Sequence, residues 1–174
     1  MMGYPRNAQN KSNNDRGRLF ENLLGHACRY YRNDKVAMIE KTPEPFRVKE
    51  KYKGGYFKGQ FTGNAQPDYK GTLRGGRAIA FEAKMTSTDR IKKSVVTKFQ
   101  ESCLNYHYEM GAYVGVVCMI KNTVAFVPWS DWQRMKELFG RQYILEKELR
   151  EYQVPTPGYV DFLRQSEGSA GDVW

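Results

Sequence analysis

The sequence predicts an α/β fold in which helices flank a mixed central sheet. Two apolar runs, Ala78–Phe81 and Ala112–Ile120, are typical of buried strands, and segments with helical periodicity lie before, between and after them. The expected order is helix, strand, hairpin, helix, strand, strand, helix, which is an α/β pattern. At 174 residues the chain is long enough for one domain with a sizeable core.

The first expected elements are a polar arm, a helix and a short strand. Residues 1–14 are rich in amide and basic side chains and predict a flexible arm. Asp15 is a suitable N-cap for a helix that runs to about Arg32, with its apolar stripe at Leu19, Leu23, Ala27 and Tyr30. Residues 36–39 predict a short strand, which ends before the proline-containing segment 42–45.

Two hairpins are expected next. Residues 46–58 alternate in part like strands, with Gly54-Gly55 as the turn, and residues 69–81 read as two short strands turned at Gly75-Gly76. The first hairpin interleaves lysines with aromatic side chains: Phe46, Lys49, Lys51, Tyr52, Lys53, Tyr56, Phe57 and Lys58. This mixture suits contact with phosphates and unstacked bases, but an exposed charged hairpin fits the local sequence equally well.

The C-terminal half alternates again between helices and strands. A polar stretch, residues 86–93, precedes a helix over about 95–110 that ends before Gly111, with a stripe at Phe99, Cys103, Tyr106 and Met110. Strands are expected over 112–120 and 123–127, joined by a turn at Lys121-Asn122. A capping-box pattern at 130–133 predicts a helix through Phe139, and a charged helix is expected over about 142–152.

Charge and cysteine content narrow the class of protein. Residues 1–100 carry 21 lysines and arginines against 9 acids, whereas residues 101–174 carry 7 against 10. A basic N-terminal half points to a polyanion such as nucleic acid, although excess positive charge can also serve solubility alone. No apolar stretch is long enough for a membrane span, and Cys28, Cys103 and Cys118 read as reduced core residues, so an intracellular, cytoplasmic protein is expected.

Two carboxylates and a lysine are placed to meet on the second hairpin. Asp68 and Glu82 are 14 positions apart, and Lys84 lies two beyond Glu82. Alternation puts Glu82 and Lys84 on one face of the strand, and the hairpin can bring Asp68 to that face. Carboxylates are hard ligands for Mg²⁺, and a bound metal can polarise a phosphodiester while a lysine stabilises the transition state.

The same residues would also fit an ordinary surface hairpin with alternating charges. Glu82, however, directly follows the apolar run Ala78–Phe81, so it lies at the end of a strand that is expected to be buried. A carboxylate at such a position costs free energy unless it is paired or coordinates a metal. The context therefore favours a metal site.

Pro67-Asp68 and Glu82-Ala83-Lys84 match the signature of the PD-(D/E)XK nucleases, and further motifs resemble the RecU-type Holliday-junction resolvases of that superfamily. The motifs occur in the family's order over roughly residues 15–130: Asp15-Arg16-Gly17 with Phe20-Glu21, Lys41-Thr42-Pro43, Tyr56-Phe57-Lys58, Asp68-Tyr69-Lys70-Gly71, Phe81-Glu82-Ala83-Lys84 and Phe99-Gln100. The resemblance implies a restriction-endonuclease-like fold, with a nuclease domain over residues 15–165, a protruding stalk-like insert at about 42–63 and a tail at 166–174.

The resemblance also implies a homodimer that uses Mg²⁺ or Mn²⁺ to nick two opposed strands of a four-way DNA junction, in recombination and repair in a bacterial or phage-infected cell. Asp68 and Glu82 would hold the metal, and Lys84 would stabilise the transition state. Gln100 matches a glutamine at the metal site. Gln66 stands where many relatives have threonine, which leaves its role as a ligand open. Relatives are also linked to recombinase and branch-migration proteins.

DNA contacts and one further acid follow from the same resemblance. Arg16 lies in a basic motif expected to touch DNA, and the stalk is expected to enter the centre of the junction with Lys49, Lys51, Lys53, Tyr56, Phe57 and Lys58. Glu21 is either an acid of the site carried on a helix or a favourable charge in a first helical turn.

Two other classes stay open. A restriction-like enzyme of the same fold would cut duplex DNA and would lack the insert, whereas a non-catalytic DNA-binding protein would be favoured if Glu82 or Lys84 were missing. Cysteine or histidine chemistry is not supported, because His26 and His107 form neither a zinc cluster nor an evident triad.

Overall fold

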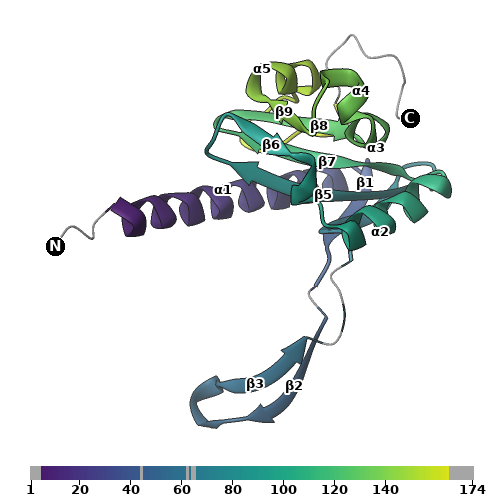
Figure 1. Cartoon of the computed structure of the whole chain (residues 1–174). Coiled ribbons are helices and arrows are strands. Elements are labelled where there is room, and N and C mark those ends of the chain that lie inside the picture. The colour runs from purple at the N-terminus through teal and green to yellow at the C-terminus, as the bar shows by residue number, and fades with distance from the viewer. Residues whose placement is uncertain (1–4, 44, 62, 64–65, 165–174) are drawn as a thin grey trace.

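A five-stranded mixed sheet forms the centre of the protein (Figure 1). The protein is described from a computed structural model, which covers residues 5–43, 45–61, 63 and 66–164, without the side chains of residues 5–12 and 61. The spatial order is β1-β4-β5-β7-β8, formed by Ala37–Lys41, Tyr69–Leu73, Ala78–Thr86, Tyr113–Ile120 and Thr123–Pro128. β5 and β7 are parallel and the other neighbours are antiparallel, which confirms the predicted fold class.

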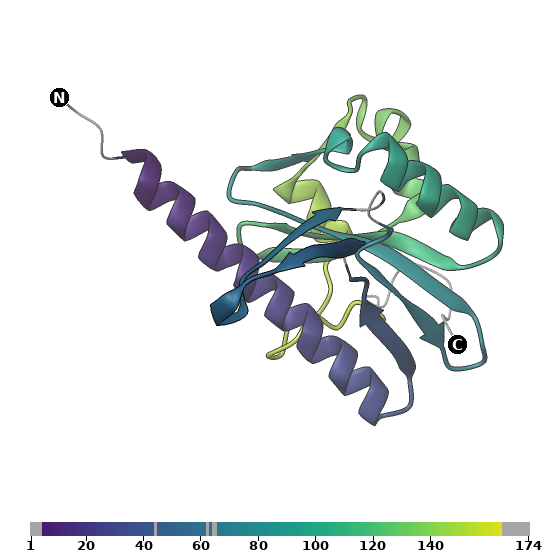
Figure 2. The same cartoon turned by 90° about the horizontal axis from the view of Figure 1, so that it is seen from below.

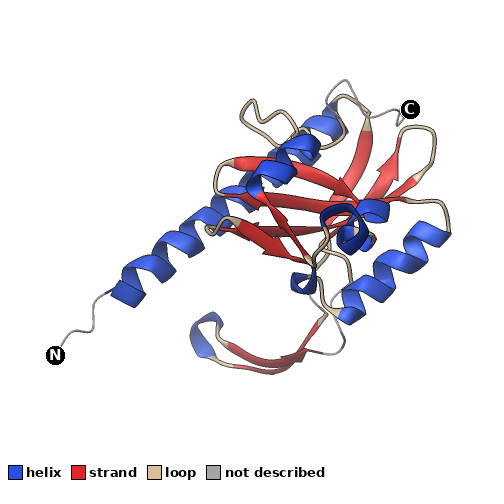
Figure 3. Cartoon of the chain, turned by 45° about the horizontal axis from the view of Figure 1, so that its top comes forward, coloured by secondary structure: helices blue, strands red, loops and turns tan. Residues whose placement is uncertain are grey.

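The two faces of the sheet bury separate cores, because side chains alternate along each strand. Helices flank the strands of the sheet (Figure 3). Helix α1, Pro5–Asn33, and the segment from Val154 to Leu163 cover one face, which we call the α1 face. The other face, the α2 face, is covered by α2, α3, α4 and α5, which are Lys98–Glu109, Trp129–Gln133, Met135–Phe139 and Glu146–Leu149.

Two small two-stranded sheets complete the fold. β2, Phe46–Lys51, pairs with β3, Phe57–Phe61, through the single turn η1, Lys53–Gly55, and this hairpin projects away from the main sheet (Figures 1 and 2). Gly54 and Gly55 have φ of 81° and 82°, so the predicted glycine turn is confirmed. The second small sheet pairs β6, Arg90–Lys92, with β9, Tyr143–Leu145, and the remaining single turns are η2, Lys93–Val95, and η3, Arg150–Tyr152.

The first helix differs from the prediction in its start and in its buried stripe. It begins at Pro5, so residues 5–14 are helical where a flexible arm was expected, and residues 1–4 lie outside the described part. Proline is favoured in the first turn, and the next residues contain no further helix breaker. The buried side chains are Phe20, Leu24, Ala27, Cys28 and Tyr31, whereas Leu19 and Tyr30 are exposed. The side chains that face the sheet thus form a stripe shifted by one residue toward the C-terminus of the helix, and its spacing is as regular as that of the predicted stripe.

Helix α2 also turns a different face inward. The predicted stripe is largely on the surface, with Phe99 43%, Tyr106 66% and Met110 87% exposed, while Leu104 is buried. Polar contacts orient the helix: Asn105 Oδ1 accepts hydrogen bonds from the Trp129 indole at 2.8 Å and from the Gln133 amide at 2.5 Å. Apolar periodicity alone could not detect these contacts with α3.

Two predictions for the C-terminal part are correct only in part. The predicted helix 130–139 is two short helices, and it starts at Trp129 rather than after a Ser130 cap, because Trp129 and Trp132 are both buried. The predicted charged helix 142–152 contains strand β9, which pairs with β6 around the buried Ile144. No helix in the described ranges is long and apolar enough to cross a bilayer.

Candidate active site

Asp68, Glu82 and Lys84 meet where β5 extends beyond the end of β4. The Lys84 ammonium donates a hydrogen bond to Glu82 Oε2 at 2.8 Å and lies 3.9 Å from Asp68 Oδ2. The Ala83 backbone N–H donates to Asp68 Oδ2 at 3.0 Å. The spatial convergence that the sequence predicts for these three side chains is therefore present.

Pairing between neighbouring strands fixes this arrangement. Tyr69 is opposite Phe81 in the β4–β5 ladder, so Asp68 reaches the backbone of β5 one step beyond the last pair. On the other side of β4, the Thr42 N–H donates to the Asp68 carbonyl at 2.8 Å. Gly71 permits the close approach of β1, because a Cβ there would lie 2.0 Å from the Met38 carbonyl oxygen.

Glu82 is a fully buried carboxylate on the α2 face. Burial raises the pKa of Glu82 from 4.5 to about 7, and the Lys84 ammonium only partly offsets this shift. Its Oε2 also accepts a hydrogen bond from Gln100 Nε2 at 2.7 Å. Its Oε1 is buried and has no hydrogen-bond partner among the described residues.

Gln100 contributes to the site through its amide nitrogen. Its carbonyl oxygen accepts from the backbone N–H of Thr97 at 3.0 Å and from the Thr97 hydroxyl at 3.2 Å, which together cap α2. These two donors identify the oxygen, so the nitrogen faces Glu82. In this arrangement the amide nitrogen of Gln100 orients the Glu82 carboxylate, whereas the resemblance implies that Gln100 is itself part of the metal site.

The donors at this edge suit a hard divalent cation. Glu82 Oε1 is a buried anionic oxygen that lacks a partner in the described part of the chain, and Asp68 presents a second carboxylate beside it. The Ala83 carbonyl points to the same side as its N–H, as in any strand, and therefore faces Asp68. No group of three or more His, Cys, Asp or Glu side chains that could hold a metal occurs in the described ranges, so backbone oxygen and water would complete the shell, as Mg²⁺ permits.

A cavity of about 220 Å³ on the α1 face adjoins Asp68. Glu21, Lys41, Thr42 and Gln66 line it, and the Lys41 ammonium donates to Glu21 Oε2 at 2.7 Å. The Gln66 carbonyl oxygen accepts a hydrogen bond from Lys70. Thr42 Oγ1 is buried without a partner among the described residues. Sequence reasoning gave Lys41 and Thr42 no role, although the Lys41-Thr42-Pro43 motif marked them.

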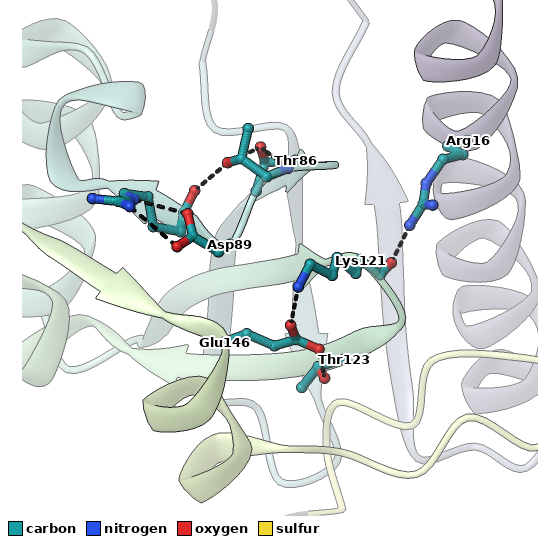
Figure 4. Close-up of polar contacts among 8 residues, drawn as sticks. Arg16, Thr86, Asp89, Lys121, Thr123 and Glu146 are labelled. Carbon is teal, nitrogen blue, oxygen red and sulfur yellow. Dashed lines mark hydrogen bonds and ion pairs between the residues drawn. The ribbon is translucent and has the colours of Figure 1, made fainter. Parts of the chain in front are cut away.

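The residues expected to touch DNA lie in two places. The Arg16 guanidinium donates to the Lys121 carbonyl in the β7–β8 turn, which gives it a structural partner (Figure 4). The hairpin residues are all exposed: Lys49, Lys51, Lys53, Tyr56, Phe57 and Lys58. Lys58 lies 3.8 Å from Glu50, and the rings of Phe46 and Phe57 are 5.5 Å apart. The structure thus keeps the hairpin side chains separate from the carboxylates.

We expect Glu82→Gln to stabilise the metal-free protein at pH 8 but not at pH 5. The pKa of Glu82 is raised on folding from 4.5 to about 7, so stability is lost as the pH rises through this window and the buried side chain ionises. The whole cost is at most about 3 kcal/mol. Thermal melts in EDTA should show a gain in Tm of a few degrees for Glu82→Gln at pH 8 only. Glu40→Gln, which neutralises an exposed carboxylate, is the control. An equal gain in Tm for Glu82→Gln at pH 5 and pH 8 would contradict the raised pKa of Glu82.

A family model and a relative at 30% identity identify the same family. The family model described as "RecU: Recombination protein U" matches residues 15–164. The Holliday junction resolvase RecU of Bacillus pumilus (strain SAFR-032) is 30% identical over 174 residues, which covers 90% of this chain and 82% of that protein. Among solved structures, the Holliday junction resolvase Hjc of Archaeoglobus fulgidus is similar with a TM-score of 0.34 and 14% identity, over 56% of this chain and 62% of that chain.

Proposed function

The chain belongs to the RecU family, and from this membership and the geometry of the site we propose that it is an endonuclease that resolves four-way DNA junctions. The observation that carries the proposal is the meeting of Asp68, Glu82 and Lys84 around a buried carboxylate oxygen that lacks a partner among the described residues. The basic N-terminal half, which contains this site, supports a polyanionic substrate.

We propose that Asp68, Glu82 and the Ala83 carbonyl hold Mg²⁺ or Mn²⁺. When bound, such an ion neutralises charge on the phosphate and lowers the pKa of a coordinated water. The chain's own residues prepare the site. Gln100 fixes the orientation of Glu82, and the backbone N–H of Ala83 fixes that of Asp68. A bound metal ion would also neutralise the buried charge of Glu82, and would thereby offset the free-energy cost of burying this carboxylate.

Lys84 is the proposed transition-state stabiliser. Its ammonium lies between the two carboxylates and is only 20% exposed, so it is held in place at the edge where a phosphate would sit. A positioned cation in a site partly shielded from water stabilises developing negative charge more strongly than one on the open surface. On the α1 side, Lys41 lines the adjoining cavity and forms an ion pair with Glu21, so this pair adds no net charge to the site.

The projecting hairpin and a dimer account for junction selectivity and paired nicks. We propose that the hairpin enters the branch point, and that two copies of the chain place one site on each of two opposed strands. A twofold assembly suits this task, since it repeats one site with a fixed geometry. A duplex-cutting enzyme of the same fold would have no use for the hairpin.

The test is cleavage of a synthetic four-way junction compared with linear duplex of the same sequence, in Mg²⁺. We expect cleavage of the junction, with nicks in two opposed strands within one binding event, and little cleavage of the duplex. Equal cleavage of both substrates would favour the restriction-like alternative. Single, independent nicks would contradict the proposed dimer. Sedimentation of the protein–junction complex tests the same point, because a monomer on the junction would also contradict it.

A further inference from the structure

A second cleft, of about 620 Å³, opens next to the active site, where β5 leads into β6. Its lining begins at Ala83 and Lys84, the residues of the proposed site, and continues to Arg90 and Lys92. It includes most of the polar stretch 86–93, to which the mechanism above assigns no role. The cleft is therefore continuous with the site and open to solvent at its far end, where Arg90 and Lys92 are exposed.

Strand β6 presents its two cations on one face. Arg90 and Lys92 are two positions apart and exposed, whereas Ile91 between them is buried in the core of the α2 face. Pairing with β9 places Lys92 opposite Tyr143 and anchors the strand around Ile91 and Ile144. The cations thus stand on an anchored strand and not on a free loop.

Two threonines shape the turn that leads to β6. The Thr88 hydroxyl donates to the Arg90 carbonyl at 3.0 Å, and the Thr88 N–H donates to Thr86 Oγ1 at 3.1 Å. Because the Thr88 hydrogen is already used, Thr86 must donate in the 2.9 Å contact between the two hydroxyls (Figure 4). Both hydroxyl hydrogens are consumed within the turn, so the threonines hold its shape and leave ligand contacts to the cations.

Arg90 and Lys92 differ in the contacts that they make within the protein. Arg90 donates from Nε and Nη2 to Asp89 at 2.9 and 3.1 Å, and its guanidinium lies 5.1 Å from the centre of the Tyr143 ring. Lys92 has no ion pair or side-chain hydrogen bond with any residue in the described ranges. Its ammonium offers three N–H donors to a ligand in the cleft.

We propose that this cleft binds the sugar–phosphate backbone of the strand that is cut, on one side of the scissile bond, with Lys92 as its main phosphate contact. This inference rests on the proposed nuclease function. A strand whose phosphate lies at Lys84 can continue along the cleft, where Lys92 meets the next phosphates and Arg90 adds to the positive field. The exposed Val95 gives the cleft an apolar side suited to a deoxyribose.

The test measures junction binding by the full-length protein in EDTA, where no cleavage occurs, over a series of salt concentrations. Lys92→Ala should weaken binding about tenfold at moderate salt, equally for junctions of different sequence. It should also reduce the slope of log K against log salt by roughly 0.9, the value for one lost phosphate contact. Lys92→Arg should restore most of the affinity. Lys136→Ala removes the same charge from α4, on the side away from the projecting hairpin, and should leave the slope unchanged (Figure 1).

The outcomes separate this inference from the function on which it rests. If Lys92→Ala and Lys136→Ala have the same slope as the parent, the cleft does not hold the strand and the inference is wrong, while the nuclease assignment stands. If the parent protein does not bind the junction at all, the proposed function itself fails. A loss confined to one junction sequence would indicate base readout and would also overturn a backbone contact.

Discussion

Asp68→Asn, Glu82→Gln and Lys84→Ala should each abolish junction cleavage, a loss on the order of a thousandfold or more, while junction binding in EDTA stays close to that of the parent. The two carboxylates are the proposed metal ligands, and the Lys84 ammonium lies 2.8 Å from Glu82 and 3.9 Å from Asp68. Affinity should survive because phosphate contacts elsewhere on the basic half supply it. Single-turnover cleavage and equilibrium binding on the same junction measure the two effects separately.

The three variants should differ in metal binding. Asp68→Asn and Glu82→Gln remove an anionic ligand and should lose Mn²⁺ binding, which can be followed by titration without any DNA. Lys84→Ala leaves both carboxylates in place and should retain it. Glu40→Gln neutralises an exposed carboxylate that pairs with Arg32 at 3.5 Å, and it should change neither cleavage nor metal binding. If all of these variants still bound Mn²⁺, Asp68 and Glu82 would not be the metal ligands.

The core of this site was predictable because it depends on local geometry. Asp68, Glu82 and Lys84 belong to one hairpin, whose turn at Gly75-Gly76 and strand alternation follow from nearby sequence. The orientation of Gln100 was not predictable, since it depends on the capping of α2 by Thr97 and on the contact of that helix with β5. The same holds for Thr42, whose N–H bonds to the Asp68 carbonyl through the β1–β4 pairing.

The fold was predictable to a similar extent. Strong apolar runs such as Ala112–Ile120 identified the central strands, and the mixed sheet follows from their order. Amphipathic periodicity could not decide which of two stripes on α2 faces the sheet: Asn105 accepts a hydrogen bond from Trp129, while Tyr106 and Met110 are exposed. Strand β9 was missed because Tyr143–Leu145 is only three residues long and its partner β6 lies far away in the sequence.

The hairpin β2–β3 has two unlike faces, which bears on how it would act at a branch point. Alternation along β3 puts Phe57 on the side of the ladder that holds Phe46 and Val48. The bulge between Val48 and Glu50 shifts the register, so that Lys51 is opposite Phe57 on this same side. The opposite side carries Arg47 and the Glu50–Lys58 pair. Tyr56, next to the turn, is 76% exposed. A side with aromatic rings and a lysine, and a charged side, suit simultaneous contact with unstacked bases and with phosphates.

Replacing residues 46–58 by a short Gly/Ser linker should therefore weaken junction binding far more than duplex binding, and should lower resolution. Duplex DNA offers no opening for the hairpin, whereas bases at a branch point can stack on its aromatic side chains, worth about 1–3 kcal/mol per base. The rest of the fold should persist, because among the described residues neither core includes a side chain from the hairpin. The measurement is the ratio of dissociation constants for a junction and a duplex of the same sequence, together with Mn²⁺ binding to verify the metal site.

A single substitution tests the role of the hairpin with less change to the structure than the linker does. Tyr56→Ala should weaken junction binding about tenfold and leave duplex binding nearly unchanged, since it removes one candidate stacking surface near the tip. Tyr106→Ala is the matched control, because Tyr106 is 66% exposed on α2 and the chemical change is identical. If the linker variant preferred junctions as strongly as the parent, selectivity would have to come from the body of the dimer. If Tyr106→Ala weakened junction binding as much as Tyr56→Ala, the effect would not be specific to the hairpin. The proposed role of the hairpin in junction recognition would then be wrong.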